Sequence, residues 1–343
     1  MRKLAIAFLI LGQFACAAAQ GKIDEEDRIF EVLQLISPQD IPKVNNMDSL
    51  SIFVRMPAQW SPAKDKEYRR KRIKSVRGVI AFSCVGSNLE TVRNDIVEGT
   101  SPYHDVIAFA DKNNLAIISW PNFRGYDARK TSDDFTKEEW KKYSDSFELR
   151  AKYWERAYRK TINAYNLPEN NMIVYGMSGG AQIAHRLVMR YPQYFIGIYA
   201  HVSSTYDAPS RQASKVLWFI STGEADGGYS NSVQFYGRLL DSGYIAIFKA
   251  FENLGHARRD DVNEMSLAFY DYLLAFMPDA NDPNWKAPPV DKFEMMKYPA
   301  YIGDYLNHLV YPAEKAVSYI DRKRMVAIPT RALAQKWGSI VEK

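Results

Sequence analysis

The sequence predicts an α/β fold in which a mostly parallel sheet is covered by helices on both faces. Between residues 50 and 277, short apolar runs with the length of buried strands alternate with segments whose apolar residues recur at helical spacing. Strands separated in this way by helices pair in parallel, and the helices cover the sheet. The composition, 47% hydrophobic and 25% charged over 343 residues, is that of a globular protein.

The first residues have the features of a secretory signal peptide. Arg2 and Lys3 precede an apolar stretch, and the alanines at positions 17–19 form a small-residue cleavage site. We therefore expect residues 1–19 to be removed and the protein to be exported, to the periplasm or as a secreted protein. A lipoprotein attached through Cys16 is the less favoured alternative, because the residues before it fit a lipid-attachment box poorly. No stretch of the sequence is long enough to cross a bilayer.

Composition and motifs argue against several classes of function. After cleavage Cys84 is the only cysteine, so no intrachain disulfide is expected. Residues 64–77 hold eight basic and two acidic side chains, which predicts a solvated loop. Without an aromatic platform, such a run does not indicate nucleic-acid binding. No zinc-ligand spacing, phosphate-cradling loop or dinucleotide fingerprint occurs, so we expect neither a metal nor a cofactor.

The first half of the chain contains three predicted strands and two predicted helices. The strands cover residues 49–56, 78–82 and 115–119. Ser101 and Pro102 begin a helix that continues to Asn113, with the serine as cap and the proline at the first helical position. A longer helix is predicted over residues 144–166, with one apolar face. Residues 22–48 are polar, apart from a short amphipathic piece at 29–36.

The second half continues the alternation and then changes character. Strands are predicted over residues 172–175, 195–202, 216–221 and 244–251, and helices over 179–191, 230–240 and 259–276. From Pro278 onward, prolines and aromatic residues are frequent. We predict an irregular C-terminal extension, residues 278–343, that packs on the domain formed by residues 20–277, because aromatic side chains are costly to leave in water.

A glycine-rich pentapeptide, Gly176-Met177-Ser178-Gly179-Gly180, lies between a predicted strand and a predicted helix. A turn this sharp holds its middle residue in strained backbone geometry and leaves no room for side chains on either flank. The outer glycines meet that steric demand. Ser178 is then expected to project its hydroxyl at the carboxyl edge of the sheet, in front of the N–H groups of the following helix.

The position of this pentapeptide resembles the nucleophile elbow of the α/β-hydrolase superfamily, and the resemblance covers about residues 50–277. It implies a parallel-sheet hydrolase domain with a serine nucleophile, followed along the chain by an acid and then by a histidine. Within the superfamily, the chain is similar to exported esterases of the dienelactone-hydrolase, polyhydroxybutyrate-depolymerase and feruloyl-esterase type.

The resemblance identifies His256 as the general base. It follows the last predicted strand in Asn253-Leu254-Gly255-His256, which is the order the superfamily requires. His201 ends a strand and is the alternative that could line the site, whereas His185 is expected to pack within the helix after Ser178. His104 begins an earlier helix, and His308 lies in the extension.

The acid is expected in the loop after the penultimate strand. Gly223-Glu224-Ala225-Asp226 resembles the Gly-x-x-Asp loop of the esterases named above, which makes Asp226 the favoured triad acid. Glu224 is a near alternative. Asp207 is a second alternative, since it matches the lipase variant in which the acid follows the preceding strand. Each could instead be an ordinary turn carboxylate.

Stabilisation of the oxyanion requires two backbone donors. The N–H of Gly179, directly after the nucleophile, is expected to be one of them. The second is expected from the loop after the strand at 78–82, through Cys84 or Val85. The family usually carries His-Gly there, whereas this chain has Ser83-Cys84-Val85-Gly86. The departure does not exclude catalysis, because a backbone donor does not depend on its side chain.

Together these features predict an exported serine hydrolase that cleaves carboxylic esters through a Ser-His-Asp triad. The aromatic residues Trp120, Phe123 and Tyr229 follow strand ends and are candidates for lining a pocket for a small-molecule or carbohydrate-linked ester. A serine peptidase of the prolyl-oligopeptidase kind is one alternative, although the residues before position 50 show no sign of the propeller domain that such peptidases carry. An inactive binding protein that retains the fold is the other. The sequence indicates neither the acyl group nor the oligomeric state.

Overall fold

The computed structural model describes residues 28–44, 47–83, 104–120, 136–279, 282, 284–289, 291–316 and 320–341. The predicted signal peptide, residues 1–19, lies outside the described residues. So do Cys84, Val85 and Phe123.

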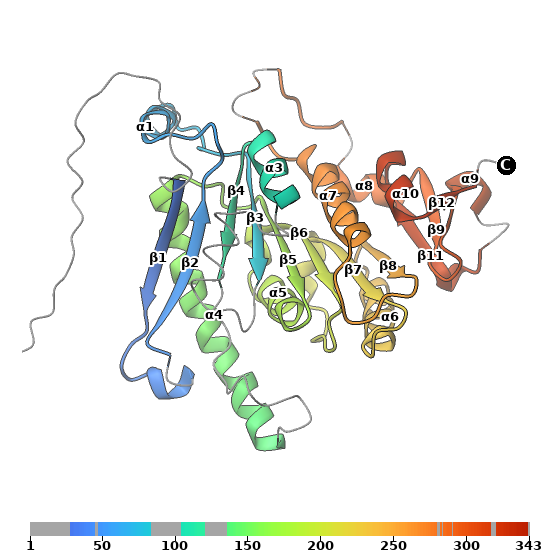
Figure 1. The fold of residues 1–343 in the computed structure, drawn as a ribbon, viewed down its shortest axis with the longest axis horizontal. Coiled ribbons are helices and arrows are strands. Elements are labelled where there is room, and N and C mark those ends of the chain that lie inside the picture. The colour runs from blue at the N-terminus through green and yellow to red at the C-terminus, as the bar shows by residue number, and fades with distance from the viewer. Residues whose placement is uncertain are drawn as a thin grey trace, which may run out of the picture.

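The main sheet has eight strands in the order β1-β2-β4-β3-β5-β6-β7-β8 (Figure 1). They are β1 (Ile29–Leu35), β2 (Ser49–Arg55), β3 (Gly78–Ser83), β4 (Leu115–Ser119), β5 (Met172–Met177), β6 (Phe195–His201), β7 (Leu217–Gly223) and β8 (Ala246–Phe251). β2 runs antiparallel to β1 and β4, and every other neighbouring pair is parallel. The predicted α/β class with a mostly parallel sheet is confirmed, and it is the arrangement that the resemblance to α/β-hydrolases implied.

Helices cover both faces of this sheet. They are α3 (His104–Lys112), α4 (Lys137–Tyr165), α5 (Gly179–Arg190), α6 (Tyr229–Asp241) and α7 (Asp260–Leu274), with short 3-10 helices at Ile41–Val44, Pro192–Tyr194 and Arg211–Lys215. Trp218 and Phe219, consecutive residues of β7, contact Phe235 of α6 and Phe269 of α7. Because consecutive strand side chains point to opposite faces, α6 and α7 lie on opposite sides of the sheet.

The remaining helices join these two layers through aromatic contacts. On the α6 face, the His185 ring of α5 lies 6.1 Å from Phe235, and the Arg186 guanidinium lies 3.9 Å above Phe147 of α4. On the α7 face, Phe109 of α3 lies 6.3 Å from Tyr270. α4 begins at Lys137, earlier than predicted, and its expected apolar face is buried.

At the N-terminus, one prediction is refined and one is wrong. The amphipathic piece at residues 29–36 is the edge strand β1, whose alternating exposure reflects one face on the core and one in solvent. The basic run was predicted to be a loop, but α1 (Pro62–Lys71) forms there, with no buried residue. The Ser61 side chain accepts the N–H of Lys64 and caps the helix, a start signal that the charge pattern concealed.

The C-terminal extension contains more regular structure than the irregular chain predicted from its prolines. A four-stranded sheet, in the order β11-β9-β10-β12, lies beside β8 (Figure 1). Its elements are α8 (Lys292–Lys297), β9 (Tyr301–Asp304), β10 (Leu309–Pro312), α9 (Ala313–Ala316), a 3-10 turn (Arg322–Arg324), β11 (Met325–Ile328), α10 (Arg331–Trp337) and β12 (Ser339–Ile340). Strands of two to four residues carry too little periodicity to be recognised in a sequence.

Trp337 anchors the extension to the main domain. Its ring is fully buried, and its Nε1–H donates to the carbonyl of Phe248 in β8 at 2.8 Å. A Cβ on Gly303 would lie 2.5 Å from this ring, so β9 can approach it only as glycine. The extension therefore shares one buried apolar cluster with the main sheet. In the described part of the chain, no helix is both long and apolar enough to cross a membrane.

Removing the Trp337 ring should destabilise the whole chain. Trp337→Ala deletes a fully buried aromatic side chain and its hydrogen bond to β8, which should lower the free energy of unfolding by about 3–5 kcal/mol. Urea unfolding followed by circular dichroism measures this. Tyr298, 81% exposed in the same extension, supplies the control, and Tyr298→Ala should change the stability by less than about 0.5 kcal/mol. Equal effects of the two substitutions would show that Trp337 does not anchor the extension.

Candidate active site

Ser178 occupies a strained turn between β5 and α5. β5 ends at Met177 and α5 begins at Gly179, so the change from strand to helix takes place at this one residue. Ser178 has φ 55° and ψ −125°, a conformation that residues with a Cβ rarely adopt. A Cβ on Gly176 would lie 2.5 Å from the carbonyl oxygen of Gly180, which explains the need for glycine there. Such backbone strain is concentrated at functional sites.

Three side chains form a continuous hydrogen-bonded chain. His256 Nε2 lies 2.8 Å from Ser178 Oγ, and His256 Nδ1 lies 2.6 Å from Asp226 Oδ2. Because an ionised carboxylate can only accept, Nδ1 carries the proton and Nε2 of the neutral ring is free to accept the serine hydroxyl. The structure thus brings together the predicted nucleophile, base and acid, whose catalytic roles stay predictions.

The three hydrogen-bonded side chains differ in their exposure to solvent. The Asp226 side chain is 1% exposed and the His256 ring is 51% exposed, while Ser178 is partly exposed. The second carboxylate oxygen of Asp226 accepts the N–H of Gly228 at 2.6 Å, a contact that the sequence analysis did not anticipate. The acid is therefore buried with both oxygens satisfied, and the base remains accessible from solvent.

The loops that carry the acid and the base are in direct backbone contact. A Cβ on Gly223 would lie 1.9 Å from the carbonyl oxygen of Leu254, so only glycine permits this approach. The N–H of Ala225 donates to the same Leu254 oxygen at 3.0 Å, and the N–H of Glu224 donates to Phe251 at 3.0 Å. These contacts fix the spacing of Asp226 and His256.

The two rival acids have other partners. Glu224 Oε1 lies 2.9 Å from Nε2 of His308 in the extension. Asp207 accepts from Arg186 Nε at 2.9 Å. Burial alone would raise the pKa of Asp207, but its interactions with His185 and Arg186 outweigh burial and lower it to about 2. Asp226 is the acid that the structure places against His256.

The other histidines are also engaged elsewhere. His201 is fully buried, with Nδ1 2.9 Å from Ser221 Oγ and Nε2 2.9 Å from the Ala257 carbonyl. Burial lowers the pKa of His201 to about 4. His185 is also buried, and its Nε2 accepts the N–H of Asp207. His104 is exposed on α3, and His308 contacts Lys249 and Glu224, so among the five histidines only His256 places its side chain against the Ser178 hydroxyl.

The predicted oxyanion and pocket residues are described only in part. Gly179 is the first residue of α5, so its N–H has no carbonyl partner within the helix and remains the candidate donor. Trp120 is fully buried, with its ring centroid 5.3 Å from that of Trp154, so it packs in the core and its predicted contact with substrate is not supported. Tyr229 begins α6, partly exposed, and its N–H donates to the Asp226 carbonyl at 3.0 Å.

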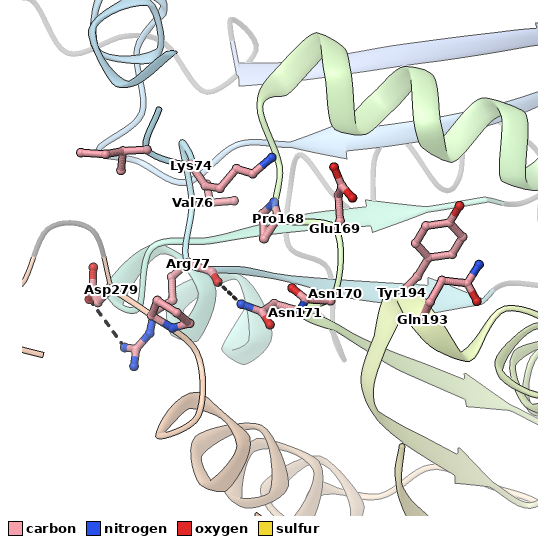
Figure 2. Close-up of a pocket in the computed structure, with 12 residues that line it drawn as sticks. Lys74, Val76, Arg77, Pro168, Glu169, Asn170, Asn171, Gln193, Tyr194 and Asp279 are labelled. Carbon is pink, nitrogen blue, oxygen red and sulfur yellow. Dashed lines mark hydrogen bonds and ion pairs between the residues drawn. The ribbon is translucent and has the colours of Figure 1, made fainter. Parts of the chain in front are cut away.

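A cavity of about 550 Å³ lies at the other end of the sheet, beside the amino ends of the parallel strands (Figure 2). Asn171, which lines it, directly precedes β5, whereas Ser178 directly follows β5. At about 3.3 Å per residue, the strand separates the two by roughly 20 Å. Arg77 lines this cavity, and its guanidinium donates to the carbonyl of Leu274 and pairs with Asp279. The backbone carbonyl of Arg77 accepts a hydrogen bond from the side-chain amide of Asn171. This cavity therefore does not serve the Ser178 site.

Comparisons with known proteins give only distant structural similarities. No family model and no curated protein matches the sequence. Among solved structures, a ferulic acid esterase from Anaeromyces mucronatus is 13% identical, with 72% of this chain and 89% of that one covered and a TM-score of 0.49. S-formylglutathione hydrolase from Staphylococcus aureus is 10% identical, with coverage of 72% and 99% and a TM-score of 0.46.

A third similar structure is a putative dipeptidyl aminopeptidase IV from Bacteroides ovatus. It is 13% identical, with 71% of this chain and 36% of that chain covered and a TM-score of 0.47, so this chain spans about a third of its length. Such distant likenesses do not determine an activity, which has to be inferred from the side chains of this site. No cluster of His, Cys, Asp or Glu suited to a metal ion occurs among the residues that the structure describes.

The buried His201 should make stability depend on pH. Its pKa is about 4 in the folded protein and 6.5 when unperturbed, so the unfolded chain binds a proton first as the pH falls. This group should therefore reduce the free energy of unfolding between pH 6.5 and 4, by about 2 kcal/mol at pH 5, and have no effect above pH 7. Urea unfolding of the wild type and of His201→Gln at pH 7.5 and 5 tests this. Equal pH dependence of the two proteins would contradict it.

Proposed function

We propose that this α/β-hydrolase-fold protein is an exported serine hydrolase that cleaves carboxylic esters through an acyl-enzyme. The main support is the hydrogen-bonded chain from Ser178 through His256 to the buried Asp226. A serine hydroxyl is a weak nucleophile, and a neutral imidazole at hydrogen-bond distance can take its proton. Export is proposed from the charged and apolar residues at the start of the sequence.

The first half of the proposed reaction forms the acyl-enzyme. Ser178 Oγ attacks the acyl carbon of the ester while its proton passes to His256 Nε2. The Asp226 carboxylate stabilises the imidazolium that results. When the tetrahedral intermediate collapses, the bond between the acyl carbon and the alcohol oxygen breaks, and His256 returns the proton to the departing alcohol.

The second half releases the acid. Water takes the place of the alcohol and gives a proton to His256 as its oxygen adds to the acyl carbon. The bond to Ser178 Oγ then breaks, and the serine recovers its proton. The N–H of Gly179, at the start of α5, is the proposed donor to the oxyanion in both halves. The second donor is proposed from the loop after β3, at Cys84 or Val85.

The proposed substrate is a small-molecule or carbohydrate-linked ester. The preference for an ester rests on the likeness of the Gly223 to Asp226 loop to that of dienelactone-hydrolase-like esterases. Tyr229 is the described candidate for contact with it, since it lies partly exposed beside the acid loop.

Replacing the nucleophile should abolish hydrolysis without unfolding the protein. Ser178→Ala should lower kcat on acetyl, butyryl and feruloyl esters by about three orders of magnitude or more. It should also remove labelling by a fluorophosphonate. The melting temperature should stay near that of the wild type, because alanine keeps the backbone and the hydroxyl contributes little packing. Ser204, exposed on a neighbouring loop, supplies the control, and Ser204→Ala should stay active. Ester turnover by Ser178→Ala within about tenfold of wild type would contradict the proposal.

The three candidate acids can be separated by substitution. Asp226→Asn should lower kcat by about three to four orders of magnitude, because the amide cannot stabilise the imidazolium and favours the wrong tautomer of His256. Glu224→Gln and Asp207→Asn, which change carboxylates bonded to His308 and Arg186, should each lower kcat by less than about tenfold. A large loss in Asp207→Asn with little loss in Asp226→Asn would move the acid to the preceding loop.

A further inference from the structure

We propose that His201 is a positioning residue that fixes the base loop, residues 252–259, over the nucleophile. This role rests on the proposed function. His201 contacts the turn that carries Ser178 and the loop that carries His256, although its own side chain has no access to solvent or substrate.

His201 joins the two loops through different atoms. It is the last residue of β6, which lies between β5 and β7 in the sheet. Its backbone carbonyl accepts the N–H of Ser178 at 3.0 Å. Its ring Nε2 lies 2.9 Å from the carbonyl oxygen of Ala257, the residue directly after His256. One residue therefore sets the positions of the nucleophile and the base relative to each other.

The proton on this ring can be assigned from its partners. A carbonyl oxygen only accepts, so Nε2 donates to Ala257. Nδ1 is then an acceptor, and the hydroxyl of Ser221 at 2.9 Å donates to it. Ser221 is the register partner of His201 in β7, so the ring is held from the neighbouring strand. Both nitrogens are satisfied by the neutral ring.

The neutral form is also the one that burial favours. The fully buried site, together with the positive charge of Arg258, lowers the pKa of His201 to about 4 although its hydrogen bond to Ala257 favours the charged form. His256 and Asp226 are the other titratable groups that act on it. At neutral pH, His201 therefore keeps one tautomer and one donor direction and exchanges no proton with the reaction.

Two backbone carbonyls that flank His256 hold the base loop to its neighbours. On the acid side, the Leu254 carbonyl accepts the N–H of Ala225. On the nucleophile side, the Ala257 carbonyl accepts from His201. His256 itself is exposed, and its hydrogen bonds within the described residues are those of its side chain to Ser178 and Asp226. Loss of the His201 contact should let the ring of His256 move, and a shift of about 1 Å can cost about a hundredfold in rate.

His185 supplies a matched control. It is also buried, and both of its ring nitrogens are bonded, but its partners are Ala181 and Asp207 rather than the base loop. His201→Phe and His185→Phe therefore remove the same chemistry from two buried sites, of which only one contacts the catalytic loops. His201→Gln keeps a donor near the position of Nε2, whereas the shorter amide of His201→Asn reaches Ser221 but not Ala257.

The experiment measures kcat and KM for ester hydrolysis and the melting temperature of these variants. His201→Phe should lower kcat by about 10- to 100-fold, with KM changed by less than about threefold. His201→Gln should recover most of the rate, and His185→Phe should change kcat by less than about threefold.

Several outcomes would overturn the inference. One is a folded His201→Phe protein whose kcat lies within about threefold of wild type. Another is an equal loss of kcat in His185→Phe, which would reveal a general effect of core damage. If His201→Phe does not fold, equal kcat values in His201→Gln and His201→Asn would overturn it. Ser178→Ala distinguishes failure of the proposed function from failure of the positioning role. If Ser178→Ala is active, the proposed function is wrong. If Ser178→Ala is inactive but the His201 variants keep wild-type activity, only the positioning role is wrong.

Discussion

Parallel pairing of β5 through β8 is the constraint on which the candidate site depends. Because the four strands run in the same direction, their carboxyl ends meet at one edge of the sheet, and Ser178, Asp226 and His256 follow three of those ends. Residues up to 78 positions apart in the chain thereby reach hydrogen-bond distance. The amino edge of the same sheet carries a cavity but no part of this chain of hydrogen bonds. Strand direction thus determines at which end of the sheet these three side chains meet.

Close approaches between backbone segments bring the three side chains to hydrogen-bond distance. Gly176 lets the first turn of α5 close on β5, and Gly223 lets the base loop close on the acid loop. Backbone hydrogen bonds and the buried His201 then hold the acid loop, the base loop and the Ser178 turn together, so the loop that carries the exposed His256 is fixed on both sides. Preorganisation of this kind matters because a catalytic group has to be held in place before the substrate arrives.

The C-terminal extension contacts the strands and loops around the site. The indole N–H of Trp337 donates to the carbonyl of Phe248 in β8, and Lys249 Nζ, also in β8, lies 4.8 Å from the centroid of the Trp337 ring. His308 lies between Lys249 and Glu224, so the extension contacts the loop that carries Asp226. Burial lowers the pKa of Lys249 to about 8. The extension is thus part of the support for the acid loop as well as part of the core.

The sequence by itself determined the fold class and the sharp turn at Ser178, because strand periodicity and glycine sterics are local properties of a chain. The expected order of acid and base came from the resemblance to α/β-hydrolases. Apart from the resemblance that favoured Asp226, the sequence did not separate Asp226 from Glu224 or Asp207, since all three are turn carboxylates and only the packing of β7 against β8 decides which one faces His256. Nor did it predict the four-stranded sheet of the extension, whose short strands become recognisable only when they pair. The role inferred for His201 depended most on tertiary structure, because its partners Ser178, Ser221 and Ala257 come from three different segments.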